Sequence, residues 1–206
     1  MTPETAEPDT ALERILVVAT RLFASLGYDG TSTRLIADAV GLNVATVAYH
    51  AGGKRDLYLL VMERAHQAEH GALSAALTEF TPDPAGLHRL LDRYLDFCVA
   101  RPEVPALWVH RWLSDASDLT QLEGMYAKPL VDTVGRAIEL AMKEMDHDPQ
   151  TDLEFTLWSF VWCIHGFGLG GTLDEQGRRL GGQDAPSLTR FRAHLHQLAD
   201  RLLVLR

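Results

Sequence analysis

Apolar residues recur at steps of three and four positions along most of the chain, which is the spacing of helices that bury one face. The first such run covers residues 11–26 and is stopped by Gly27, a residue suited to a helix end. Later runs cover residues 54–77, 86–100, 104–113, 118–145 and 187–206, and one that begins at Asp148-Pro149 extends through His165. No segment shows convincing strand alternation, so the pattern predicts an all-α protein.

Proline and glycine refine this pattern. Pro129 lies inside one of the predicted helices, so we expect a kink or break near Lys128. Glycines are frequent over residues 166–182, which predicts a loop there. Ser187 is expected to cap the last helix.

Residues 31–58 carry the most distinctive local pattern. Three successive hydroxyl residues, Thr31 to Thr33, can cap a short helix that Gly41 ends, and Asn43 can cap a second short helix. Two helices of about two turns around a glycine-containing turn are typical of a helix-turn-helix, whose second helix enters the DNA major groove. With the first run as its support, residues 11–57 are predicted to form a three-helix DNA-binding domain.

Charge is distributed unevenly along the 206 residues. The net charge of -9 argues against a chain coated in phosphate-binding side chains. Residues 14–57, however, contain five basic and three acidic side chains, while the flanking segments are acidic. This distribution favours local contact with nucleic acid.

The N-terminus and the cysteines bear on location. Residues 1–10 are acidic and contain proline, so we expect a disordered tail, and they lack the basic-then-apolar order of a secretory signal. Cys98 and Cys163 lie in apolar runs and are interpreted as buried thiols in a reducing compartment. The expected location is the cytoplasm.

Three pieces of the N-terminal segment, LFASLGYDGTSTRLIADAVGLN, VATVAYH and GGKRDLY, together resemble the TetR (tetracycline-repressor) family of one-component regulators. The resemblance covers about residues 11–60 and implies a helical ligand-binding and dimerisation domain over residues 58–206. It also implies a homodimer paired through its last two helices, about 150–170 and 187–206, on a palindromic operator. The family usually has a bulky residue where this chain has Ala51, a loss of about 2–4 kcal/mol of packing unless a neighbour fills the gap.

The exposed residues of the second short helix are mostly small. Val44, Ala45 and Ala48 can meet thymine methyl groups but cannot form bidentate hydrogen bonds with bases. Polar readout would therefore fall to Arg34 on the preceding helix, for which a solvated surface arginine is the alternative. By the family's pattern the phosphate ligands are Thr33, Thr46, Tyr49, His50 and Lys54. Thr33 is equally well explained as a helix cap, and capping or packing is the alternative for the rest.

Three other patterns point to other functions. Residues 66–70 read H-x-x-E-H, an inverted zinc-peptidase motif, but no third acidic ligand follows at a recognisable spacing, so a solvated or interdomain helix face is favoured over catalysis or metal binding. Residues 166–171 match G-x-G-x-x-G without the strand and helix that a dinucleotide site needs. Residues 155–173 lack charge, yet their glycines favour a helix buried between subunits over a membrane span.

Aromatic residues in the C-terminal part can line an apolar cavity. Core packing is the ordinary explanation of each, but in a domain that the family uses for sensing we expect part of the group to face a ligand. The aromatic candidates are Phe97, Trp108, Trp112, Tyr126, Phe155, Trp158, Trp162 and Phe167. The candidate polar groups are Cys98, His110 and His165.

The sequence therefore predicts a homodimeric, ligand-responsive transcriptional repressor with no cofactor, no metal and no enzymatic activity. A small, largely apolar effector is expected to shift residues 54–77 and so release the operator. The alternative is a helical small-molecule-binding enzyme that retains a DNA-binding segment without using it.

Overall fold

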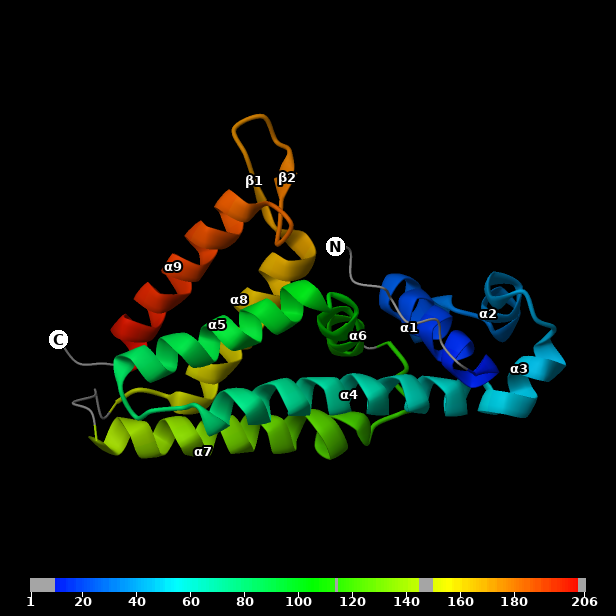
Figure 1. Cartoon of the computed structure of the whole chain (residues 1–206), viewed down its shortest axis with the longest axis horizontal. Coiled ribbons are helices and arrows are strands. Elements are labelled where there is room, and N and C mark those ends of the chain that lie inside the picture. The colour runs from blue at the N-terminus through cyan, green and yellow to red at the C-terminus, as the bar shows by residue number, and fades with distance from the viewer. Residues whose placement is uncertain (1–9, 114, 145–149, 204–206) are drawn as a thin grey trace. The chain divides into compact units, whose positions relative to one another are not determined.

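The computed structural model describes residues 10–113, 115–144 and 150–203, and the chain over these residues is almost entirely helical (Figure 1). The predicted all-α class is confirmed. The described residues of Met1–Ala65 and Ala106–Leu119 form a first compact unit, and those of His66–Pro105 and Thr120–Arg206 form a second. Except for Thr10, the predicted tail lies outside the described residues.

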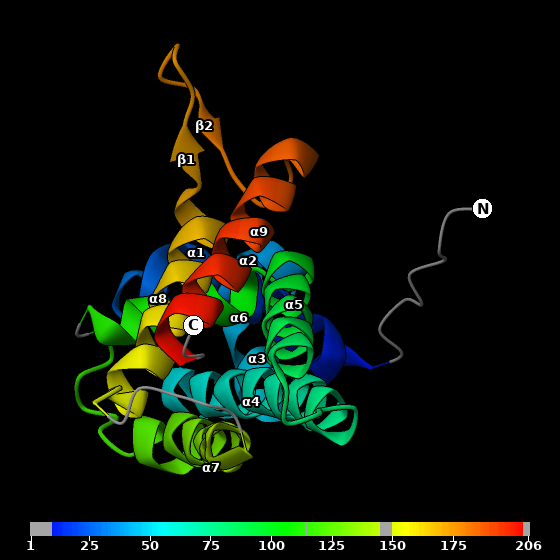
Figure 2. The same cartoon turned by 90° about the vertical axis from the view of Figure 1, so that its left-hand side faces the viewer.

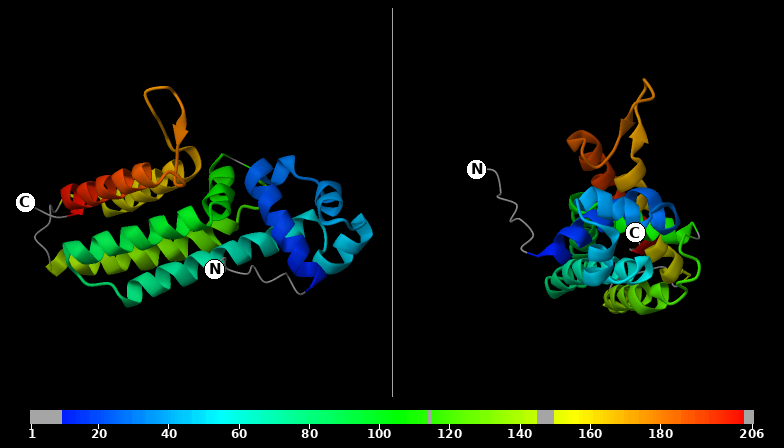
Figure 3. Two further views of the ribbon diagram at one scale, coloured as in Figure 1. Left: turned by 45° about the horizontal axis from the view of Figure 1, so that its top comes forward. Right: turned by 90° about the vertical axis from the view of Figure 1, so that its right-hand side faces the viewer.

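The first unit is built on three helices that pack against one another, α1 (Ala11–Gly30), α2 (Thr33–Val40) and α3 (Val44–Ala51) (Figure 3). It also contains α4 (Lys54–Thr78) as far as Ala65, and α6 (Glu103–Trp112) from Ala106 on. Its core is apolar and contains Ile15, Phe23, Ile36, Val47, Leu57 and Trp108, all fully or almost fully buried.

Helix α1 passes the predicted stop at Gly27. Gly27 adopts φ 73°, which interrupts the helical path, and the chain then resumes a helical turn to Gly30. A residue with a side chain rarely takes this backbone conformation, so glycine here is a conformational requirement. The predicted end at Leu26 is therefore a kink, because the helix resumes beyond it.

The helix-turn-helix has the caps that the sequence predicts. Ser32 Oγ accepts a hydrogen bond from the Leu35 amide (3.1 Å), and Gly41 ends α2 at φ 75°. Asn43 Oδ1 accepts from the Thr46 amide (2.8 Å) at the start of α3. Each side chain satisfies an amide that a helix start leaves without a partner.

The second unit contains the rest of α4, α5 (Pro84–Ala100), the π-helix η1 (Glu123–Ala127), α7 (Lys128–Glu144), α8 (Leu153–Gly170) and α9 (Ala185–Leu203). Helix α5 packs on α8 and α9, and α7 packs on α8 (Figure 2). Their contact faces share one apolar core, which includes Leu90, Leu95, Ile138, Phe160, Ile164 and Leu195.

The segment before α7 differs from the prediction of one helix from residue 118. Residues 115–121 form turns, and the helix begins as the π-helix η1, in which the Lys128 amide donates to the Glu123 carbonyl. Pro129 lacks an amide proton, and in a regular helix its ring would clash with the carbonyl four residues earlier. The wider π-turn just before it is the break that proline predicts.

Helix α8 and the segment after it also differ from the prediction. The predicted start of α8 at residues 148–149 lies outside the described residues, and α8 begins at Leu153, where Asp152 Oδ1 accepts from the Phe155 amide. The helix runs on to Gly170, so residues 166–170 are not loop. Strands β1 (Thr172–Leu173) and β2 (Arg179–Leu180) then form an antiparallel hairpin that projects beyond α8 and α9 (Figures 1 and 2). The prediction of no strand is therefore wrong.

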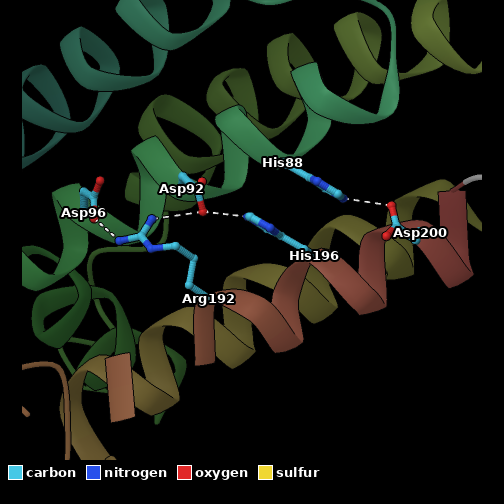
Figure 4. A network of polar contacts seen from close by, with 6 residues as sticks. All are labelled: His88, Asp92, Asp96, Arg192, His196 and Asp200. Atoms are coloured by element: carbon cyan, nitrogen blue, oxygen red, sulfur yellow. Dashed lines mark hydrogen bonds and ion pairs between the residues drawn. The ribbon is translucent and has the colours of Figure 1, made fainter. Parts of the chain in front are cut away.

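Helix α9 begins earlier than predicted and is joined to α5 by a row of polar contacts (Figure 4). Asp184, not Ser187, accepts the capping hydrogen bond, which the Ser187 amide donates. Asp92 of α5 accepts from both His196 and Arg192 of α9 (2.8 and 2.9 Å). Three further residues extend the row, in the pairs His88–Asp200 and Arg192–Asp96.

Among the helices within the described residues, none combines the length and the apolar character needed to cross a membrane.

Candidate nucleic-acid interface and effector site

Helix α3 turns most of its candidate residues to solvent. Val44, Ala45, Ala48, Tyr49 and His50 are exposed, and Thr46 is half-buried. Tyr49 is 84 % exposed and its ring lies edge-on to that of His50. An exposed aromatic pair at the end of a short capped helix has no packing role, which leaves it available to a partner.

The opposite side of α3 anchors it in the first unit. Val47 is fully buried and Ala51 is 4 % exposed. Because the Ala51 site is closed by its neighbours, a bulkier side chain there would force them to move. The small residue is thus part of a packed core on the inner side of α3.

Helix α2 contributes two candidates beside α3. The Arg34 side chain is exposed, and no hydrogen bond or ion pair joins it to another described residue. Thr33 is half-buried, and since Ser32 provides the α2 cap, capping does not account for Thr33. Both side chains are free to meet a ligand outside the unit.

Lys54, the first residue of α4, is held by an aromatic ring. Its Nζ lies 4.2 Å from the centroid of the Tyr28 ring, a cation–π arrangement. Tyr28 in turn packs against Tyr58 at a ring distance of 4.8 Å. Asp56 Oδ2 accepts from the Gly53 amide (2.9 Å), so a carboxylate already occupies part of this helix N-terminus.

The eleven candidate effector residues do not gather in one place. Trp108, His110 and Trp112 belong to the first unit and the others to the second. Within the second unit, Phe155 and Trp162 are 64 % and 48 % exposed on α8, where Trp158 stacks on Trp162. The expectation that both cysteines are buried is wrong, because Cys163 is exposed and only Cys98 is buried.

Other candidates meet around a tyrosine that sequence reasoning missed. The Tyr94 hydroxyl donates to Glu69 Oε1 (2.8 Å) and lies 2.8 Å from His165 Nε2. Since the phenol has one proton and Glu69 receives it, the Tyr94 oxygen accepts from His165 Nε2–H. Phe97 stacks beside Tyr94, and Cys98 lies on the same helix in electrostatic contact with it.

Burial controls the protonation of this cluster. Desolvation lowers the pKa of His165 to about 4, which keeps the imidazole neutral. Desolvation and the Glu69 charge raise the pKa of both Tyr94 and Cys98, which keeps the phenol and the thiol protonated. The cluster therefore presents one buried carboxylate among neutral polar groups.

The motifs that point to other functions lie on α4 and α8. Glu69 of the H-x-x-E-H motif is only 5 % exposed, so the expectation of a solvated face is wrong for it, and His66 stacks on Tyr126. Within the described residues, no group of three or more His, Cys, Asp or Glu side chains is placed to hold a metal ion. The G-x-G-x-x-G motif lies on the last turn of α8, not between a strand and a helix.

The sequence and the fold of this chain resemble those of known proteins. Residues 15–61 match the family model described as bacterial regulatory proteins, tetR family. A tetR family regulatory protein from Rhodococcus RHA1 has 19% identity and a TM-score of 0.76, with 97% of this chain and 100% of that chain covered. The TetR family regulator PfmR from Thermus thermophilus has 18% identity and a TM-score of 0.71, with coverage of 97% and 99%.

A third similar structure contains both kinds of ligand. AibR, solved in complex with isovaleryl coenzyme A and operator DNA, has 17% identity and a TM-score of 0.70, with coverage of 93% and 97%. No curated protein sequence matches the chain.

The matched segment contains the capped α2–turn–α3 unit and its supporting helix, which is the arrangement of a helix-turn-helix transcriptional regulator. The protein is a DNA-binding transcriptional regulator. Over residues 15–61 it matches the tetR family model, and along nearly its whole length it has the fold of TetR family regulators.

Proposed function

We propose that the protein is a homodimeric repressor that binds a palindromic operator and releases it when a small, largely apolar effector binds. The observation that carries this proposal is the exposed face of α3, which is capped and anchored from behind by Val47 and Ala51. A rigid helix with a solvent-facing surface of this kind can enter a major groove.

The DNA contacts divide by chemistry. The phosphate ligands in this proposal are Thr33, Thr46, Tyr49, His50 and Lys54. Arg34 reads a guanine edge, and Val44, Ala45 and Ala48 meet thymine methyl groups. Because the three small side chains carry little base-specific information, DNA shape contributes to operator choice.

The proposed dimer interface is the exposed apolar side of α8. Phe155, Trp162 and Leu169 follow one another along this helix and are all exposed, as is Leu202 of α9. Large apolar side chains aligned on one helix surface favour burial against a partner. Pairing with the same helices of a second copy would form a four-helix interface and place two α3 helices roughly 34–36 Å apart.

The proposed effector site is the region around Tyr94, Glu69 and His165. Each buried polar group there costs free energy unless it is paired. Phe97 stacks beside Tyr94, and Phe167 belongs to the apolar core against which Tyr94 packs, which favours an effector with an apolar body. AibR was solved with an acyl-coenzyme A, which supports small-molecule control for a protein of this fold.

The proposed functions belong to two successive parts of the chain. We assign DNA binding to residues 11–57, and effector binding and dimerisation to residues 58–206. The alternative function, an enzyme that does not use its DNA-binding segment, makes the opposite prediction about DNA affinity.

The deciding experiment is selection of duplexes from a random library by the wild-type protein, followed by fluorescence anisotropy. Recovery of a palindrome that binds at moderate salt supports the repressor. Lys54→Ala should then weaken binding to all duplexes and reduce the salt slope by about 1, whereas Lys128→Ala, on α7, should not. Failure to enrich any duplex at low salt would overturn the proposal.

A further inference from the structure

A segment distant in the sequence contributes an acidic side chain to the DNA-binding unit. Asp115 follows α6, yet its carboxylate accepts hydrogen bonds from the amides of Tyr28 (to Oδ2, 2.5 Å) and Asp29 (to Oδ1, 2.8 Å). Two successive N–H groups that converge in this way form an anion-binding nest. The nest at the end of α1 is thus filled by a carboxylate of the chain itself.

The backbone of α1 is shaped to receive Asp115. Gly27 has φ 73°, and a Cβ added there would lie 3.0 Å from both carboxylate oxygens of Asp115. Only glycine therefore permits both the turn and the approach of the carboxylate. His110 adds a second link, because its Nε2 lies 3.2 Å from the Ala24 carbonyl.

The turn that presents Asp115 is itself fixed by a buried arginine. Arg111 Nη1 donates to the carbonyls of Asp115 (3.0 Å) and Ala116, and Nη2 donates to Leu119 (3.0 Å). Ala116 is held at φ 51°, a conformation that persists only where its surroundings enforce it. Asp115 is therefore presented from a rigid turn.

Asp115 is linked to Lys54 through the Tyr28 ring. Asp115 fixes the Tyr28 amide, and the Tyr28 ring carries the Lys54 ammonium at 4.2 Å. We propose that Asp115 is a positioning residue for DNA binding, which holds the Tyr28 ring so that Lys54 is placed for a phosphate contact. This inference rests on the proposed function for its consequence, but the positioning of Lys54 can be measured without DNA.

The chain provides its own internal controls for that measurement. It contains three lysines, and the other two, Lys128 and Lys143, form ion pairs with carboxylates on α7. Reductive methylation with 13C-labelled formaldehyde keeps the charge and gives each lysine an NMR signal. The Lys54 signal should be shifted upfield by the Tyr28 ring current, and the other two should not.

The test compares Asp115→Asn with Asp118→Asn. Asp118 lies in the same segment and near Tyr28, but it forms no hydrogen bond in the nest. D118N therefore reproduces the charge change of D115N without the loss of a nest hydrogen bond. We expect D115N to move the Lys54 signal towards those of Lys128 and Lys143, while D118N leaves it in place. An unchanged Lys54 signal in D115N would overturn the inference, whatever the protein does with DNA.

DNA binding supplies the second readout, on a duplex selected by the wild-type protein. D115N should weaken binding about tenfold, the effect of losing one charge-assisted hydrogen bond, and lower the salt slope towards that of K54A. Adding D115N to K54A should change the slope no further. A merely destabilised protein would lose affinity with an unchanged slope, and that result would also overturn the inference. If D115N loses the Lys54 shift but the wild-type protein binds no DNA, the proposed function is refuted and the positioning role of Asp115 stands.

Discussion

The Tyr94 hydroxyl and the Glu69 carboxylate share a hydrogen bond of 2.8 Å that ties α5 to α4 within the second unit. Glu69 is almost fully buried, so its carboxylate depends on donors supplied by the protein. A buried carboxyl group is costly unless its oxygens accept hydrogen bonds, which makes the donor from Tyr94 important to stability.

Removal of that donor should destabilise the second unit. We expect Tyr94→Phe to lower the free energy of unfolding by about 1–3 kcal/mol, because Glu69 then loses one partner while it stays buried. Urea denaturation followed by circular dichroism measures this loss. Tyr49→Phe is the matched control, since the Tyr49 ring is exposed and should tolerate the change without loss. Equal stabilities for both variants would contradict this account of Glu69.

The neutral state of His165 predicts a pH dependence of stability. Its pKa is lowered from 6.5 to about 4 in the folded protein, whereas the unfolded chain titrates near 6.5. Between these values the unfolded state binds a proton that the folded state does not, so stability should fall as the pH drops from about 6.5 to about 4. The full effect is up to about 3 kcal/mol.

The contribution of His165 is isolated by comparison with His165→Gln. Glutamine can still donate a hydrogen bond to the Tyr94 oxygen but does not titrate. Urea midpoints of the two proteins should diverge progressively below pH 6.5 as the wild type loses stability faster. Parallel pH profiles would show that His165 titrates normally in the folded state.

The exposed side of α8 predicts a variant that separates the dimer. Phe155→Glu should give a monomer in light scattering after size-exclusion chromatography, because it places a charge within the proposed apolar interface. Leu140→Glu is a close control, since Leu140 on α7 is 63 % exposed against 64 % for Phe155. If L140E and F155E remain equally dimeric, the interface lies elsewhere.

Two glycines with positive φ should respond differently to alanine. Gly41 has φ 75°, and no neighbouring atom lies within 4 Å of the point that a Cβ would occupy, so Gly41→Ala should cost only the backbone penalty of about 1–2 kcal/mol. At Gly171 a Cβ would lie 2.2 Å from the Leu180 carbonyl oxygen. Gly171→Ala should therefore displace the hairpin and expose residues 172–180 to limited proteolysis, which G41A should not do.

The DNA-binding unit could be predicted from the sequence because its signals are local. Ser32, Gly41 and Asn43 act on residues within one turn of themselves, and the structure confirms each of these caps and the helix end. The apolar steps of α1 and α5 likewise reflect one buried face. Sequence periodicity detects such features because they repeat along a single element.

The missed features depend on contacts between distant segments. Tyr94, Glu69 and His165 lie on three helices, so no spacing in the sequence brings them together. Asp115 lies 87 positions after Tyr28 in the sequence. The hairpin strands have two residues each, too few for an alternating pattern, and the glycines of α8 resemble a loop although the helix continues through them.

The π-turn at Glu123–Ala127 has a consequence for related chains of different length. Its Lys128–Glu123 hydrogen bond spans one residue more than an α-helical bond, so the turn contains one extra residue. In a chain that also lacks Pro129, deletion of a single residue within this turn would convert it to regular α-helix and leave Leu130, Ile138 and Met142 facing the same core. The start of α7 is therefore a position where a one-residue insertion or deletion can be absorbed without rotating the helix that follows.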